Sequence, residues 1–303
     1  VDGSTKFGKN NKYGFFPSLS GAWRISGEEF FEPLMDTFSD LKLRVGYGVT
    51  GNQEFPGGVS LAVFNANSDG SITQVNNPNP DIQWEETTQW GIGLDFELYQ
   101  GRLSGSLDYF NKQTDNLIFR QDYAQPAAVD YQWVNLDGTV INKGWEFMLN
   151  AYPVDGTSFT WQIGYNMSFL ENTVRDLSTF VNTGAIHGQG LTGAYGQRIA
   201  SGQPLFSFYM REFVGFDENG LGIYANNGEL GFVGDPLPDM TLGLNNTFYI
   251  GRWDVSAFLE GAFGFQVYNN TANAIFLKGN LRNGRNVTRE IAQSDENPNN
   301  FGE

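Results

Sequence analysis

His187 is the only histidine in the chain, and the chain has no cysteine. A zinc site needs several histidine, cysteine or carboxylate ligands, and a Ser–His–Asp triad needs partners that hold its histidine. A lone histidine in a loop-like segment meets neither requirement. We therefore interpret His187 as a solvated loop residue and predict no catalytic residue and no metal site.

Three short patterns resemble sites for other ligands. Residues 188–193 read G-Q-G-L-T-G, but a dinucleotide-binding turn needs a strand before it and a helix after it, and the flanking residues predict neither. Residues 217–220, D-E-N-G, lack the repeated oxygen ligands and terminal glutamate of an EF-hand calcium loop. The acidic pairs at 28–29 and 85–86 point their carboxylates to opposite sides of a strand, unlike a glycosidase pair. We predict neither enzymatic activity nor a cofactor.

Aromatic rings are the remaining candidates for chemistry. Tyr123, Tyr131 and Trp133 lie in a long segment without regular alternation, which predicts a loop. Rings in a loop can stack on a sugar or hold a peptide. A competing interpretation is that these rings pack one loop against another. We predict Tyr123, Tyr131 and Trp133 as substrate-binding residues, with the packing alternative left open.

The elements that would position these loops are long alternating strands. From Trp90 to Leu98 every second residue is apolar, and the residues between them are small or polar. A period of two predicts a strand with one apolar and one wet face. A turn at residues 99–101 leads into a second alternating strand that ends near Phe110, so the two strands form a hairpin.

The length of this hairpin favours a membrane. Soluble strands usually run about 5–6 residues, whereas a strand tilted across a bilayer needs roughly 9–11. The polar face carries Asp95, Glu97 and Asp108, which suit a water-filled lumen better than a close-packed core. A charge at Leu94 should therefore disturb assembly, and one at Asp95 should be tolerated. The predicted lipid-facing wall residues are Trp90, Ile92, Leu94, Phe96, Trp161 and Ile163.

The connections alternate in length along the chain. Alternating strands are also predicted at 15–25, 41–49, 145–151, 159–169, 241–250 and 253–265. Turns of about three to five residues, as at 153–156, join strands on one side, and segments of about thirty residues join them on the other. Short periplasmic turns and long external loops are typical of antiparallel outer-membrane β-barrels. The last forty residues are predicted to be irregular.

Composition narrows the class further. The 303 residues hold 18 basic and 34 acidic side chains, a formal net charge of −16, which argues against nucleic acid as a partner. The chain has 38 glycines and 15% aromatic residues, and no apolar run approaches the length of a transmembrane helix. Residues 1–3 look like the middle of a strand, so we expect the natural N-terminus to lie upstream.

Several phrases resemble one known family. FFPSLSGAWRIS, LKLRVGYGVTGNQ, NPDIQWEETTQWGIGLDF, RLSGSLDYFNKQTDNLI and NLDGTVINKGWEFMLN followed by FTWQIGYNMSF are similar to the C-terminal barrel of SusC/RagA-type TonB-dependent transporters of Bacteroidetes. The resemblance runs from about residue 15 to 265. It implies part of a 22-stranded barrel in the bacterial outer membrane that imports oligosaccharides or peptides. It also implies a SusD-like surface lipoprotein and TonB as partners.

The resemblance sets expectations about the rest of the protein. We expect residues 1–303 to form part of one barrel domain, with the N-terminal plug that would contact TonB and the final strands absent from this chain. The rival interpretation from another class is a secreted β-rich glycan-binding module or a glycosidase, which would have shorter strands and be water-soluble. A passive porin would have the same wall and lack plug and lid. The choice between glycan and peptide is left open.

Overall fold

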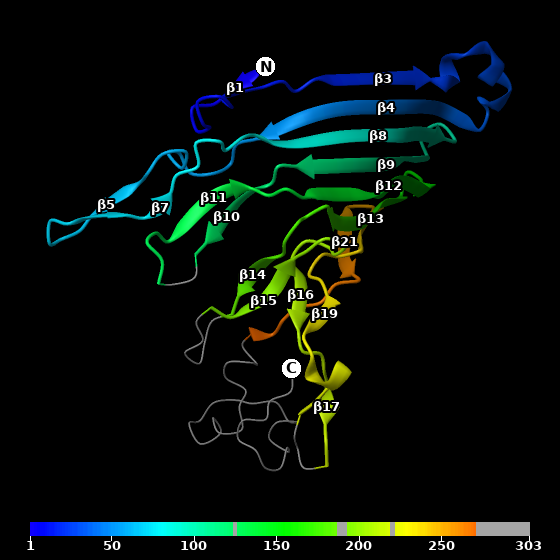
Figure 1. Ribbon diagram of the computed structural model, residues 1–303. Helices are drawn as coiled ribbons and strands as arrows, with labels where there is room; N and C mark the ends of the chain where they lie inside the picture. The colour runs from blue at the N-terminus through cyan, green and yellow to red at the C-terminus, as the bar shows by residue number, and fades with distance from the viewer. Residues whose placement is uncertain (124–125, 187–192, 219–221, 271–303) are drawn as a thin grey trace. The chain divides into compact units, whose positions relative to one another are not determined.

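The computed structural model describes residues 1–123, 126–186, 193–218 and 222–270 (Figure 1). The chain forms two compact units, one made of residues 1–178 and 238–264 and the other of residues 179–237 and 265–303. Within the described ranges, no helix has the length and hydropathy needed to cross a bilayer. Nearly all regular structure in both units is antiparallel β-strand.

The first unit contains a sheet of eight strands, which we call the wall. Its order is β21-β20-β13-β12-β9-β8-β4-β3, and all its pairs are antiparallel. Figure 1 shows β3, β4, β8, β9 and β12 side by side. The wall strands are β3 (Ser18–Arg24), β4 (Phe38–Asn52), β8 (Glu85–Leu98), β9 (Leu103–Asp115), β12 (Thr139–Asp155), β13 (Phe159–Arg175), β20 (Met240–Ile250) and β21 (Trp253–Phe263).

Short and long connections alternate as predicted. The β8–β9 hairpin turns through Tyr99, Gln100 and Gly101, whose φ angles of 54°, 58° and 87° are left-handed. Gly251 does the same at the β20–β21 turn, with φ at 62°. Two short 3-10 helices, η1 (Ile25–Gly27) and η2 (Glu29–Leu34), join β3 to β4. The opposite ends of the strands lead into the long segments 53–84, 116–138 and 176–239.

The strands are longer than their alternating cores. β12 begins at Thr139 and β13 ends at Arg175, six residues beyond the predicted limits at 145 and 169. The ladder continues there without alternation, pairing Thr139 with Arg175 and Lys143 with Glu171. The predicted turn at 153–156 is wrong: β12 runs to Asp155 with a register shift between Ala151 and Val154. Pro153 lies at that irregularity, where its missing N–H breaks no ladder bond.

The N-terminal segment and the long connections carry small sheets of their own. β1 (Asp2–Gly3) pairs with β2 (Tyr13–Gly14), and β5 (Phe64–Ala66) pairs with β6 (Ile72–Gln74). A third sheet joins β10 (Ile118–Asp122), β11 (Tyr131–Asn135) and β7 (Asn76–Asn77). The long segments between the predicted strands therefore contain several strands of two to five residues, which are too short to show a period in the sequence.

A packed cluster lies among these connections, and we call it the loop core. It contains the buried side chains Phe7, Phe55, Val59, Ile82 and Trp84. The Phe7 ring lies 4.5 Å from Trp84 and 5.1 Å from Phe55, centroid to centroid. The Lys6 ammonium donates to the carbonyls of Gln53 and Phe55 at 3.2 and 2.8 Å, which ties the N-terminal segment to the loop.

The second unit holds two further sheets. One has the order β14 (Val181–Ala185), β15 (Tyr195–Ile199), β16 (Ser207–Met210), β19 (Gly231–Gly234), and Ile199 and Phe208 are buried in it. The other pairs β17 (Phe213–Phe216) with β18 (Gly222–Tyr224), which leads into the 3-10 turn η3 (Ala225–Gly228). Most of the segment predicted to be irregular, residues 271–303, lies outside the described residues.

Candidate functional site

The wall has two chemically different faces. Residues directly opposite each other in an antiparallel pair point to the same side. Val45, Ile92, Tyr109, Trp145 and Phe169 follow one another across five strands in this way, and we call their side the apolar face. The next residue on each strand gives Arg44, Gly93, Asp108, Glu146 and Ser168, which lie on the polar face.

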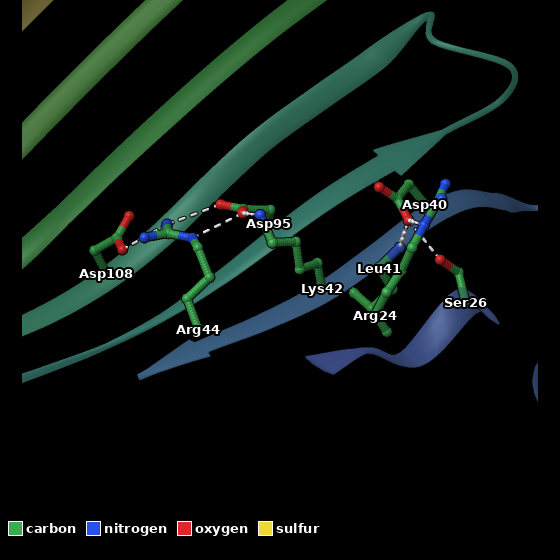
Figure 2. Close-up of polar contacts among 8 residues, drawn as sticks. All are labelled: Arg24, Ser26, Asp40, Leu41, Lys42, Arg44, Asp95 and Asp108. Atoms are coloured by element: carbon green, nitrogen blue, oxygen red, sulfur yellow. Dashed lines mark hydrogen bonds and ion pairs between the residues drawn. The ribbon is translucent and has the colours of Figure 1, made fainter. Parts of the chain in front are cut away.

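Arg44 is the centre of an ionic network on the polar face (Figure 2). Its guanidinium donates from Nε and Nη2 to the two carboxylate oxygens of Asp95, at 2.7 and 2.8 Å. Nη2 also donates to Asp108 Oδ1 at 2.7 Å, and Lys42 Nζ lies 3.6 Å from Asp95. One arginine thus joins β4 to both β8 and β9. The planar fork of arginine suits this bidentate contact.

Gly93 makes this reach possible. It lies opposite both Arg44 and Asp108, between them in the sheet. A Cβ at Gly93 would collide with Asp108 Oδ1 and would lie 2.8 Å from Arg44 Nη2. Only a residue without a side chain leaves room for the guanidinium to cross β8. The glycine and the two charged residues therefore form one structural unit.

A second ion pair lies toward the short-turn end of the same face. Arg24 Nε donates to Asp40 Oδ1 at 2.8 Å, and the hydroxyl of Ser26 donates to the same oxygen (Figure 2). The sequence places Arg24, Lys42, Arg44, Asp95 and Asp108 on polar positions of alternating strands. Pairing them requires the register of β3, β4, β8 and β9, which the alternation alone does not supply.

The polar face is hollowed beside this network. A hollow of about 770 Å³ lies over β3, β4, β8 and β9. Gly46, Gly48 and Gly91 contribute to its floor, and a Cβ at Gly46 would meet nothing within 4 Å. Arg44, Asp108, Lys112 and Glu146 are among its charged lining residues. The absence of side chains on the floor leaves open space beside charges of both signs.

The apolar face ends at a line of rings. Trp90, Tyr109 and Trp145 follow one another with centroids 5.3 and 4.9 Å apart, and Phe169 lies opposite Trp145. We call these four residues the aromatic row. In register with Trp90 the same face turns polar: Asn111 lies opposite both Trp90 and Lys143, and Lys143 Nζ pairs with Glu171 at 2.9 Å. At the other end, Phe159, Ile250 and Trp253 form the last apolar row.

The predicted wall residues share this apolar face. Trp90, Ile92, Leu94 and Phe96 alternate along β8, and Trp161 and Ile163 lie on β13. Trp90 and Ile92 are exposed, whereas the other four are half-buried by their neighbours on the sheet. Register places Leu94 opposite Leu43 and Leu107, and Trp161 opposite Phe248. Their contact with lipid stays a prediction.

The predicted substrate-binding rings do not act as one group. Trp133 packs on the loop core, 6.2 Å from Phe55 between centroids, which is the packing alternative. Tyr131 stacks beneath the Arg120 guanidinium at 4.3 Å. Tyr123 donates its hydroxyl to Gln132 Oε1 at 2.8 Å. Tyr131 is the first residue of β11 and Tyr123 directly follows β10, and the role of all three rings in substrate binding stays a prediction.

Other candidate positions take part in hydrogen bonds or lie outside the described residues. Glu85 accepts hydrogen bonds from Asn52 and from the Ile118 backbone, so it caps the wall and the β10 start. No group of three potential metal ligands occurs in the described ranges. His187 and residues 188–192 lie outside the described residues, as do 219 and 220.

Two loop carboxylates and one phenol have shifted pKa values. The hydroxyl of Ser71 holds the pKa of Asp69 below its ordinary value, helped by the Ser71 backbone N–H. Hydrogen bonding from Ser178 likewise lowers the pKa of Asp137. In the second unit, burial raises the pKa of the Tyr268 phenol. None of these groups has the paired acid and base arrangement of a catalytic centre.

Comparison with known proteins agrees with this two-faced sheet. A family model described as TonB dependent receptor-like, beta-barrel matches residues 1–289. TonB-dependent receptor P26 of Formosa agariphila is 30% identical over 300 residues, which cover 89% of this chain and 30% of that protein. TonB-dependent receptor SusC of Bacteroides thetaiotaomicron is 29% identical over 304 residues, covering 90% and 30%. The chain thus spans under a third of the length of these relatives.

Solved structures show the same fold. The structure of the RagAB peptide transporter superposes with a TM-score of 0.79 at 21% identity, covering 91% of this chain and 32% of that one. The RagAB importer in its open-open state gives 0.70 at 20% identity, covering 88% and 30%. The predicted resemblance and the all-β barrel fold class are confirmed. With its two-faced wall and a family match over 289 residues, the chain belongs to the β-barrel family of TonB-dependent receptors.

Proposed function

We propose that the protein containing this chain is an outer-membrane, TonB-dependent importer of the SusC type, which takes up oligosaccharide or peptide nutrients. One observation carries the proposal: the chain belongs to this family, and its wall has an apolar face that ends at the aromatic row on one side and at the row of Phe159, Ile250 and Trp253 on the other. On β13 this face runs from Phe159 to Phe169. At about 3.3 Å per residue and a tilt near 45°, ten steps rise about 23 Å, close to the roughly 25 Å apolar band of outer-membrane barrels.

The two faces then have separate tasks. The apolar face contacts lipid through Trp90, Ile92, Leu94, Phe96, Trp161 and Ile163. The polar face lines the interior, where the Arg44 network and the hollow beside it meet water or solute. Unpaired strand edges are not viable in lipid, so further strands of the longer protein pair with β3 and β21.

In this proposal the chain forms part of a passage for the solute and catalyses no reaction. Asp95 and Asp108 pair with Arg44, Glu85 accepts two hydrogen bonds, and the described residues contain no group of three potential metal ligands. Energy comes from TonB, acting on a plug region outside this chain. A SusD-like surface lipoprotein covers the loop side and delivers the substrate, and Tyr123 and Tyr131 are candidate contacts for it.

Energised uptake tests this proposal. The full-length protein is expressed in its outer membrane, and uptake of labelled oligosaccharides and peptides is measured with and without TonB. Membrane location with TonB-dependent uptake of either substrate class is expected. Uptake that persists without TonB would support a passive porin instead.

Cell fractionation distinguishes the importer from the remaining alternative. A secreted β-rich glycan-binding module or glycosidase would be recovered from the culture medium without detergent. The importer is expected in the outer-membrane fraction, at a mass several times the 33.7 kDa of this chain. Recovery of a water-soluble protein of about that smaller mass would refute the importer.

A further inference from the structure

The four-stranded sheet of the second unit carries an arginine between two rings. The Arg198 guanidinium carbon lies 3.8 Å from the centroid of Phe180 and 3.6 Å from that of Tyr209. Tyr209 meets Phe232 edge-on, with centroids 5.0 Å apart. Register places Asn182 opposite Arg198 and Phe232 opposite Tyr209. We call Phe180, Arg198, Tyr209 and Phe232 the ring platform.

Both faces of the guanidinium are covered, but its edge is only partly used. Arg198 Nε donates to Asn182 Oδ1 at 3.2 Å. Among the described residues no carboxylate forms an ion pair with Arg198, whereas Arg24 and Arg120 each have one such partner and Arg44 has two. The rings fix the plane of the fork and remove water from its faces. A fork held in this way is preorganised to receive a carboxylate along its two terminal nitrogens.

Exposed rings flank this fork. Phe180 is 53% exposed and Phe232 is 38% exposed, so each offers part of its surface to a ligand held at Arg198. The flat C–H face of a sugar ring packs well on such an aromatic surface. An extended peptide would pair with a sheet edge, at β14 or β19. The ring platform lies across the sheet face instead, which favours a sugar ring over a peptide strand.

The surrounding charge limits the kind of anion. The described part of the second unit holds two arginines, Arg198 and Arg211, against five acidic residues, Glu212, Asp217, Glu218, Glu229 and Asp235. A densely charged polyanion would be repelled by this field before it reached the fork. A mostly neutral chain with one carboxylate avoids that repulsion and still uses the bidentate contact.

We propose that the ring platform binds a saccharide bearing an isolated carboxylate, held at the Arg198 fork and stacked on Phe180 and Phe232. This site refines the proposed import function by naming a substrate class. Binding to purified protein is measured without TonB. A failure of this site is therefore distinguishable from a failure of import.

Calorimetry on the full-length transporter in detergent tests the site. The probes are xylotriose carrying one glucuronate branch, its methyl ester, and unbranched xylotriose. The acidic probe is expected to bind at least about tenfold more tightly than the other two, since a charged bidentate hydrogen bond supplies that margin. Equal affinity for acid and ester, or no binding of the acid, overturns the proposal.

Substitutions of Arg198 distinguish the bidentate geometry of its guanidinium from its positive charge. Arg198→Met and Arg198→Lys are each expected to weaken binding of the acidic probe about tenfold or more, because an ammonium retains charge without the fork. Arg211→Met removes the same charge from the same unit and should change affinity less than about twofold. An equal loss in Arg211→Met would show a field effect and overturn the site.

Two further arms keep the test decisive if Arg198 variants fold poorly. Phe180→Ala removes an exposed ring and is expected to weaken the acidic probe about threefold while leaving the circular dichroism spectrum unchanged. An unchanged affinity in that variant contradicts stacking.

A blocked tripeptide with one central glutamate should bind at least tenfold more weakly than the acidic sugar. Equal or tighter peptide binding overturns the saccharide assignment.

Discussion

The wall and the loop core bury apolar side chains against different surroundings. Ile82 in the loop core is 0% exposed and Phe7 is 2% exposed, as in the interior of a soluble domain. On the wall, Trp90 is 46% exposed and Val45 is 50% exposed, although both lie within a continuous ladder. The loop core is completed by its own side chains. The apolar face of the wall is left uncovered by the described residues, which fits the proposed contact with lipid.

With the wall in lipid, as proposed, this difference lets one chain be stable in two solvents. The wall satisfies its backbone through strand pairing, which holds in lipid or in water. The loop core depends on removing apolar surface from water, so it gains stability only on the watery side. The aromatic row would lie at the boundary between the two solvents, since Asn111, Lys143 and Glu171 follow Trp90 in register on the same face.

The largest expected effect comes from opening the loop core. Phe7→Ala should destabilise the loops by about 3–5 kcal/mol, because it removes a fully packed ring that contacts Phe55 and Trp84. Hydrogen exchange should speed up in residues 53–84 and remain slow in β8 and β9. Equal acceleration in the wall strands would show that loop core and wall are one cooperative unit.

A charge on the apolar face should have the next largest effect. Leu94→Arg is expected to destabilise the folded barrel by about 2–4 kcal/mol at mid-wall. Ser104→Arg, opposite Glu97 on the polar face, is the matched control and should cost less than about 1 kcal/mol. Unfolding in detergent or lipid measures both, and equal losses would contradict the assignment of faces.

The structure corrects the control suggested by the sequence. Asp95 was expected to tolerate a positive charge because it faces the interior. Its carboxylate instead binds Arg44 and lies near Lys42, so Asp95→Arg would place three cations together. A loss of stability in the Asp95→Arg variant would therefore report on the ionic network and not on which face of the sheet residue 95 occupies.

Disturbing the Arg44 network should lower the unfolding free energy of the wall by an intermediate amount. Gly93→Ala is expected to destabilise the wall by about 1–3 kcal/mol, because the added methyl group collides with Asp108 and crowds Arg44. In an Arg44→Met background the same substitution should cost clearly less. A double-mutant cycle on unfolding free energies measures this coupling, and additive effects would show that the guanidinium does not depend on Gly93.

The smallest effect concerns pH and the β5–β6 hairpin. Because the folded-state pKa of Asp69 is lowered, its hydrogen bonds with Ser71 stabilise the hairpin above the unfolded-state pKa and are lost as pH falls below about 4. Ser71→Ala should raise the pKa of Asp69 toward its ordinary value. Carbon-13 NMR of labelled aspartate carboxyls follows the titration. An unchanged pKa would refute the role of the hydroxyl.

Alternation was enough to predict the wall but not its contacts. Apolar residues at every second position fixed the hairpins at Trp90 and Trp161 because one face must be dry. The ends at Thr139 and Arg175 were missed since no periodic signal remains once both faces are wet. The Arg44–Asp95 pair, 51 residues apart, depends on strand register, and the ring platform depends on strands of four or five residues. Trp133 shows the same limit, because the sequence alone does not distinguish an aromatic loop residue that packs in a core from one that contacts substrate.

The extension of β12 and β13 past the aromatic row has a consequence for how solutes would approach the proposed importer. Six paired residues on each strand, 139–144 and 170–175, span roughly 20 Å along the strand, or about 14 Å of height at a 45° tilt. With the bilayer at the apolar face, these paired strand ends would form a rim that projects above the lipid surface. Molecules that diffuse along the membrane meet its outer side. On the proposed assignment, solutes would therefore arrive over the top of this rim, on the side that the proposed lipoprotein covers, and not by sliding along the lipid surface.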